Sequence, residues 1–283
     1  MKAEFEKTML NDVYGLSCVE NFLLYAMKSE DYEYKYLYHG SYLSMRDITD
    51  EFIENNARYA SFYRIQRLQE LAAQNSLIEW KYMRHDDFTG YIDDYDYSAI
   101  MIKPEHIAVK YKTELWREDH FLLIGQKGPE SFYYLNDNPR DNGIISYGEL
   151  QSIYAGEMIG FTIKNKIGKA LRHEFLDIFI GSISAAPRRS NFEFPDLMMA
   201  RDTLGVIRTS RKRICDYCGI YIPVDFYRDF ISSIEKLYAS IEYMRLRKSS
   251  DMDKINRQFE ELQEQDIELA SVLSAEMKGA HGK

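Results

Sequence analysis

A cysteine at the predicted start of a helix is the strongest chemical signal in the sequence. Ser17 and Glu20 form an S-x-x-E capping box, which predicts that Ser17 is the N-cap and that a helix begins at Cys18. Unpaired N–H groups and the positive end of the helix dipole meet at such a position, and both favour the thiolate form of a cysteine. Cys18 is therefore a candidate nucleophile. The alternative is a buried structural cysteine, which is the usual fate of a free thiol.

A histidine and an acidic residue on a predicted β-hairpin supply the groups that a cysteine nucleophile needs. His120 begins one strand, and Asp137 follows the strand that returns after a turn near Gly128. In this hairpin His120 faces Asn136 or Asp137. A carboxylate there could hold the imidazole through Nδ1 and leave Nε2 for the thiol. The sequence thus predicts a Cys18–His120–Asp137 triad for acyl chemistry.

Hydrophobic periodicity predicts the elements that position these residues. Strands are expected at 77–83, 98–102, 106–111, 120–124, 131–135, 143–146 and 157–163, with 31–44 as a further strand or extended segment. Helices are expected at 18–28, 47–73, 146–150, 169–183, 196–209, 225–248 and 251–277.

The order of these elements predicts an α+β fold with two domains. Residues 1–165 form a catalytic domain, in which an N-terminal helix carries the cysteine and an antiparallel sheet carries the histidine and the aspartate. Residues 166–283 form an all-helical domain whose last two helices read as an antiparallel pair.

The composition narrows the class of protein. Hydrophobic residues make up 45% of the 283 residues and charged residues 29%, as in soluble globular proteins. A net charge of −9 argues against nucleic-acid binding. The chain has no apolar run that approaches the ~20 residues of a membrane span, and no apolar signal core follows Met1. Three cysteines do not make a disulfide framework, so we expect a cytoplasmic protein with reduced thiols.

Three segments of the chain resemble papain-fold proteins. They are Leu16-Ser17-Cys18-Val19-Glu20-Asn21, Asp119-His120-Phe121-Leu122-Leu123-Ile124 and Tyr134-Leu135-Asn136-Asp137-Asn138-Pro139. The resemblance covers about residues 10–165 and is closest to bacteriocin-processing-like peptidases and butirosin-type acyltransferases of antibiotic biosynthesis. The whole chain also resembles, more weakly, cysteine-protease-like enzymes of the kind that forms an amide bond on a carrier-protein thiotemplate in closthioamide biosynthesis.

The resemblance implies a papain-like fold and an acyl-transfer function. Cys18 would be the nucleophile, His120 the general base and acid, and Asp137 the residue that orients the imidazole. The donor would be an acyl or peptidyl carrier protein of the nonribosomal-peptide type, which supplies phosphopantetheine, so the chain itself needs no bound cofactor. The acceptor would be a small amine, with a diamine as one option.

Two other functions stay open. A papain-like cysteine peptidase would share the triad and pass the acyl group to water or to a peptide. A non-enzymatic helical interaction protein would use its paired C-terminal helices as the seam of a homodimer. Substitution of Cys18 separates this last alternative from both enzymes.

The chain departs from the papain pattern at the oxyanion position. Papain-like enzymes place a glutamine six residues before the cysteine, where this chain has Asp12, preceded by Asn11. An ionised aspartate cannot donate a hydrogen bond. Either Asn11, a protonated Asp12 or backbone N–H groups, including that of Cys18, would have to stabilise the oxyanion.

Basic clusters in the C-terminal half are candidates for docking an acidic carrier protein and its phosphate. The candidates are Arg188, Arg189, Arg211, Lys212 and Arg213. The alternative is that they form solvated helix ends. Cys215 and Cys218 make a C-x2-C pair with neither a second pair nor suitably spaced histidines, so we expect no metal site, and their role stays open.

Overall fold

The structure is a computed structural model, and it divides the chain into two compact units. It describes residues 5, 17–55, 68–112, 120–128, 130–185, 192–223, 227–249 and 251–281. Unit 1 comprises Met1–Tyr34 and Arg67–Lys166, and unit 2 comprises Lys35–Gln66 and Ile167–Lys283. The sequence predicts that the first domain runs over residues 1–165, whereas the described residues 35–55 belong to unit 2, with the C-terminal helices.

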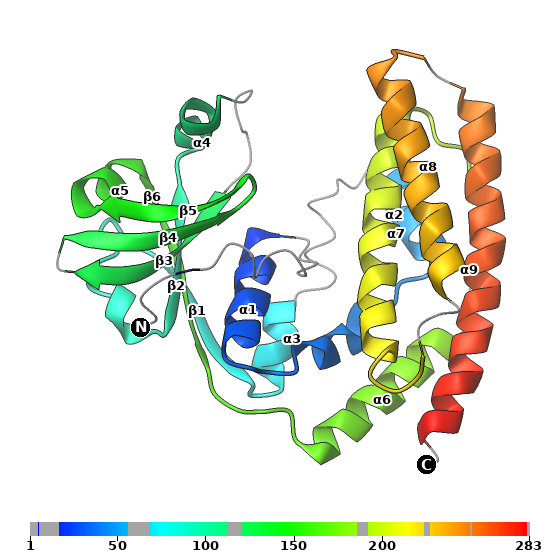
Figure 1. Cartoon of the computed structure of the whole chain (residues 1–283), viewed down its shortest axis with the longest axis horizontal. Helices are drawn as coiled ribbons and strands as arrows, with labels where there is room; N and C mark the ends of the chain where they lie inside the picture. Colours follow the sequence, from blue (N-terminus) through cyan, green and yellow to red (C-terminus); the bar gives the residue numbers. More distant parts are fainter. Residues whose placement is uncertain are drawn as a thin grey trace. The chain divides into compact units, whose positions relative to one another are not determined.

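Unit 1 is an α+β structure built on a six-stranded antiparallel sheet (Figure 1). The strands are β1 (Ile78–Arg84), β2 (Tyr97–Ile102), β3 (His120–Gly128), β4 (Ser131–Asp137), β5 (Arg140–Ser146) and β6 (Tyr154–Ile163). They lie in the order β1-β6-β2-β3-β4-β5, with each neighbouring pair antiparallel. β3 and β4 form the predicted hairpin.

Helices lie against the sheet of unit 1. They are α1 (Cys18–Ser29), α3 (Leu68–Gln74), α4 (Pro104–Tyr111) and α5 (Tyr147–Ile153), with a short 3-10 turn, η4 (Ile92–Asp94). α1 contacts β2, β3 and β4, and the hydroxyl of Ser29 lies 3.0 Å from that of Tyr97 on β2. Ile100 and Ile102 point to the other face of β2, where they share a core with Ile107 of α4 and with α5.

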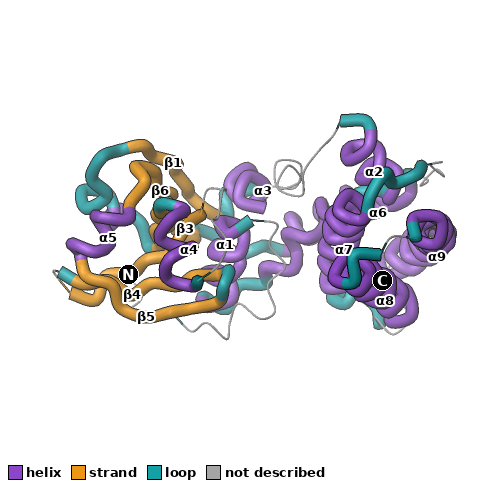
Figure 2. The backbone as a smooth tube through the Cα atoms, turned by 90° about the horizontal axis from the view of Figure 1, so that it is seen from above, coloured by secondary structure: helices purple, strands orange, loops and turns teal. Residues whose placement is uncertain are grey.

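The described part of unit 2 contains helices (Figure 2). They are most of the 3-10 helix η2 (Tyr34–Ser41), α2 (Met45–Ile53), α6 (Lys169–Ser184), α7 (Leu197–Cys218), α8 (Arg228–Leu246) and α9 (Met252–His281). α7 packs against α2 and α8, and α9 packs against α6 and α8. α8 and α9 run in opposite directions, as the sequence predicted (Figure 1). Among the described helices, none combines the length and the apolar character that would cross a membrane.

Three predicted elements differ from the structure. The tyrosine-rich segment 31–44 contains η2 and no strand, and Leu37 and His39 between the tyrosines are buried too, so the segment lacks the in-out alternation of a strand. Residues 106–111 belong to α4, since Pro104 at the first turn is preorganised for a helix. The helix predicted over 47–73 is α2 and α3, and residues 56–67 lie outside the described part of the chain.

Candidate active site

Cys18 is the first residue of α1, as the capping box predicted. Ser17 is the N-cap, with an extended backbone, and its Oγ accepts a hydrogen bond from the N–H of Glu20 at 3.2 Å. The buried carboxylate of Glu20 accepts a hydrogen bond from the N–H of Leu68 at 3.1 Å. This second bond joins α1 to α3 and fixes the start of the helix within unit 1.

The thiol of Cys18 does not have the low pKa that its helix position suggested. Burial and, second, the carboxylate of Asp137 raise the pKa of Cys18 to about 12, although the N–H groups of Phe121 and Val19 act to lower it. Desolvation therefore outweighs the helix terminus, which was expected to favour the thiolate form. The same interactions place the thiol beside the start of β3 and the end of β4.

β3 and β4 part at the end of the sheet where the candidate residues lie. Their ladder stops at Leu123 opposite Leu135, although the strands themselves run on to His120 and Asp137. The register therefore differs from the predicted one, in which His120 faced Asn136 or Asp137. Because side chains alternate along each strand, His120 and Asn136 share one face of the sheet as diagonal neighbours, and Asp137 belongs to the other face.

Asn136 is the close partner of the imidazole. Nε2 of His120 lies 2.5 Å from Oδ1 of Asn136 and 4.0 Å from Oδ1 of Asp137. Both residues of the close pair are buried, with His120 3% exposed and Asn136 fully covered. An amide oxygen can only accept, so Nε2 carries the proton. Sequence analysis assigned this place to Asp137 acting on Nδ1; the structure has Asn136 acting on Nε2.

Asp137 occupies a separate position between the helix and the imidazole. Its Oδ2 accepts a hydrogen bond from Nδ2 of Asn21 at 2.7 Å. Its Oδ1 is buried and has no hydrogen-bond partner among the described residues. One oxygen thus links α1 to β4, while the other presents negative charge to the thiol and to His120.

Sequence analysis missed three residues of this site. Asn21 lies one helical turn after Cys18, so the helix period could have identified it. The hydroxyl of Tyr111 accepts a hydrogen bond from Asn136 and donates one to Asp141. Tyr111 was assigned to a strand instead of the end of α4, so its position could not be predicted.

The proposed oxyanion donors and part of the basic cluster cannot be placed. Asn11, Asp12, Arg188 and Arg189 lie outside the described residues. Their assignments stay predictions from the sequence.

Two residues of the basic cluster, Arg211 and Arg213, are buried and form no docking surface. Arg211 is 2% exposed, and its Nε and Nη2 donate to the carboxylate of Asp266 at 2.6 and 2.7 Å. Arg213 is fully buried and its guanidinium lies 5.6 Å from the centre of the Tyr38 ring. Lys212 pairs with Glu235 at 2.6 Å. The assignment of Arg211 and Arg213 to carrier docking is therefore wrong, because both side chains are buried inside unit 2. For Lys212, which is partly exposed, the assignment stays a prediction.

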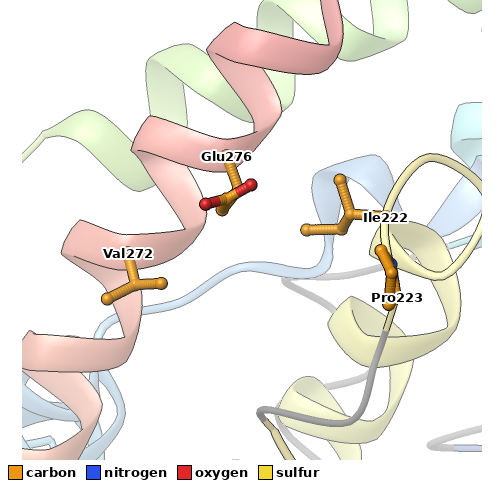
Figure 3. A pocket seen from close by; sticks show the side chains of 4 residues that line it. All are labelled: Ile222, Pro223, Val272 and Glu276. Carbon is orange, nitrogen blue, oxygen red and sulfur yellow. The ribbon is translucent and has the colours of Figure 1, made fainter.

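Unit 2 contains two further features, the Cys215–Cys218 pair and a pocket. Cys215 and Cys218 lie in the last turn of α7, where burial raises the pKa of each thiol to about 12. A pocket is lined by Ile222, Pro223, Val272 and Glu276, with Val272 and Glu276 one turn apart on α9 (Figure 3). Within the described ranges, no group of three His, Cys, Asp or Glu side chains is placed to hold a metal ion.

Comparisons of the sequence with models of protein families and with curated proteins found no significant match. The functional interpretation therefore depends on the geometry around Cys18, His120 and Asn136. That geometry combines a thiol at a helix start, an imidazole with a defined N–H, and a nearby carboxylate. Such groups can form and resolve a thioester on the cysteine.

Proposed function

We propose that the protein is a cysteine-dependent acyltransferase that forms an amide bond through a thioester on Cys18. The observation that carries this proposal is the short contact between His120 Nε2 and Asn136 Oδ1, at the same end of the sheet as the thiol. A Cys–His–Asn set is the variant of the catalytic triad used by papain-like proteases. The resemblance of the segments around Cys18 and His120 to papain-fold proteins supports the same interpretation.

In the first half-reaction the donor acylates Cys18. Because Nε2 of His120 carries the proton directed at Asn136, Nδ1 is the ring atom that accepts the thiol proton. The sulfur attacks the carbonyl carbon of the donor thioester and forms a new C–S bond. The C–S bond of the donor breaks, and the donor thiol leaves with the proton from His120.

The raised pKa of Cys18 makes His120 essential to this step. A thiol whose pKa is about 12 is protonated at neutral pH, so a base must remove its proton as the attack proceeds. Oδ1 of Asp137 lies 4.0 Å from Nε2 of His120, and the same carboxylate raises the pKa of Cys18. Asp137 thus acts on the charge of the thiol, whereas Asn136 acts on the orientation of the imidazole.

In the second half-reaction an amine takes the acyl group. The amine nitrogen attacks the acyl carbon, the C–N bond forms, and the bond to Cys18 breaks. The proton of the amine passes through His120 to the cysteine sulfur. Exchange of one thioester for another is nearly balanced, and amide formation drives the sequence forward. A carrier-protein phosphopantetheine thioester as donor and a small amine as acceptor are supported by the resemblance alone.

Intact-mass spectrometry tests the proposal. The protein is incubated with an acyl-pantetheine thioester, and we expect one acyl group on Cys18 and one equivalent of released thiol. Addition of a small diamine should then produce the amide and return the protein to its original mass. Cys18→Ala should abolish acylation, whereas the matched double variant Cys215→Ala/Cys218→Ala should acylate as the wild type does.

Two outcomes would overturn the proposal. Acylation mapped to Cys215 or Cys218, or no acylation at all, would remove Cys18 as the nucleophile. A Cys18 thioester that decays to the free acid at the same rate with and without amine would indicate a hydrolase. Cleavage of peptides by the same variant series would then identify a peptidase.

A further inference from the structure

A chain of hydrogen bonds runs from the buried His120 through Asn136 to the partly exposed Tyr111 and Asp141 of unit 1. Nδ2 of Asn136 donates to the hydroxyl of Tyr111 at 3.2 Å. The hydroxyl of Tyr111 donates to Oδ2 of Asp141 at 2.8 Å. Tyr111 is the last residue of α4, and Asp141 lies on β5 opposite Asn136. Three elements therefore meet behind the imidazole.

The direction of every hydrogen bond in this chain follows from Asp141. An ionised carboxylate can only accept, so the single hydroxyl proton of Tyr111 points to Asp141. Toward Asn136 the Tyr111 oxygen can then only accept, and it must meet the amide NH2. Once Nδ2 of Asn136 is committed to Tyr111, Oδ1 of the amide is the atom that faces His120.

We propose that Tyr111 is a positioning residue that sets the tautomer of His120 through the amide of Asn136. With Oδ1 of Asn136 facing the ring, the neutral imidazole carries its proton on Nε2 and has its lone pair on Nδ1. The opposite amide orientation would place an N–H donor against Nε2 and move the ring proton to Nδ1, where it would block base catalysis. For catalysis this inference rests on the proposed function, because it concerns the base that serves Cys18.

The surroundings of Asp141 keep it a pure acceptor. Burial acts to raise the pKa of Asp141, but hydrogen bonds from Tyr111, Tyr134 and Lys110 hold it below its usual value. Tyr134 donates to the same Oδ2 at 2.8 Å, and Nζ of Lys110 lies 3.2 Å from it. The carboxylate is therefore ionised at neutral pH, and the direction of the chain does not reverse.

The tautomer can be measured without turnover. Protein labelled with 15N-histidine is examined by two-bond 1H–15N correlation at a pH where the ring is neutral, and His120→Gln assigns the signal of His120. We expect the Nε2–H pattern in the wild type. Tyr111→Phe removes the acceptor for Asn136, and we expect its spectrum to gain the Nδ1–H pattern. Its kcat should fall by about 10- to 100-fold, with KM changed less than twofold.

Tyr134→Phe is the matched control. It removes a hydroxyl that donates to the same oxygen of Asp141 and that, among the described hydrogen bonds, has none to Asn136, so His120 should keep the Nε2–H pattern. An unchanged pattern in Tyr111→Phe, or an equal shift in Tyr134→Phe, would overturn the inference. The spectra do not depend on acylation of Cys18. Failure of the inference about Tyr111 and failure of the acyltransferase proposal are therefore separate observations.

Discussion

Nδ2 of Asn21 donates a 2.7 Å hydrogen bond to Oδ2 of Asp137, and this bond joins the helix that carries Cys18 to the strand that carries Asn136. Asn21 lies one turn after the cysteine on α1. Asp137 directly follows Asn136 on β4 and is the residue whose charge acts on the thiol. A polar contact within unit 1 thus ties α1 to β4 at the end of the sheet where Cys18 and His120 lie, in addition to the packing of α1 on the sheet.

Asn21→Ala should destabilise the protein and reduce acylation of Cys18. The substitution leaves the buried Oδ2 of Asp137 without its donor, which costs about 1–3 kcal/mol. The measurement pairs urea unfolding with the rate of acyl-enzyme formation. Asn75→Ala is the control, because Asn75 donates only to Leu71 O at the end of α3 among its described contacts. Equal effects in the two variants would show that the Asn21–Asp137 bond has no special role.

Asn136→Ala should lower turnover more than Asp137→Asn does. Loss of Asn136 removes the acceptor for His120 Nε2, and loss of an orienting partner costs about 10²- to 10⁴-fold. Asp137→Asn keeps an oxygen that can accept from Asn21 and leaves the His120–Asn136 contact in place. Single-turnover acylation by a pantetheine thioester measures both. The reverse ranking would restore Asp137 as the orienting residue.

Asp137→Asn should also make Cys18 react faster with iodoacetamide. The carboxylate is the second cause of the raised pKa, so its neutralisation lowers the pKa of the thiol from about 12. Below the pKa, each unit of decrease gives about tenfold more thiolate at a fixed pH. The residue Cys18 is partly exposed, although its thiol is enclosed enough for burial to raise its pKa, so the experiment compares the labelling rates of the two proteins.

The alkylation experiment is a pH series between about 7 and 10, with labelling of Cys18 followed by mass spectrometry. Asp86→Asn is the control, because Asp86 is an exposed aspartate of the same unit. Unchanged labelling in Asp137→Asn would mean that the Asp137 charge does not reach the thiol.

Arg211→Met should unfold unit 2 at lower urea concentration instead of weakening the use of a carrier-bound donor. Removal of one partner from a buried ion pair costs about 3–5 kcal/mol, because the other charge is left uncompensated. The double variant Arg211→Met/Asp266→Leu should recover most of that loss. Lys212→Met, at a more exposed pair, should cost about 0–1 kcal/mol. A normal unfolding midpoint with a raised KM for the carrier-bound donor would instead support docking at Arg211.

The sequence predicted the elements whose signals are local. The capping box at Ser17 located the start of α1, and two short apolar runs on either side of a glycine-rich turn located β3 and β4. The helical period located α6, α8 and α9. These patterns depend on the chain's own geometry, so no knowledge of tertiary packing was needed.

The details of the site depend on contacts that are not local. Whether Asn136 or Asp137 faces the imidazole of His120 depends on the register of β3 against β4, which differs by one to two residues from the predicted register. A shift of one residue moves a side chain to the other face of the sheet. The pKa of Cys18 depends on burial and on the charge of Asp137 at the end of β4, neither of which the helix terminus alone reveals. Arg211 appeared as part of a surface cluster because its partner, Asp266, lies 55 residues away.

The division of unit 2 between two distant segments has a consequence for the order in which the protein forms. Ser41 accepts a hydrogen bond from Ser210 across 169 residues of sequence, and α2 packs on α7. During synthesis the apolar side chains of α2, among them Ile48 and Phe52, emerge before all of β1–β6 and well before α7. Unit 1 can therefore fold before α7, the packing partner of α2, has been synthesised. Until then, α2 is the part of the nascent chain most exposed to misassociation.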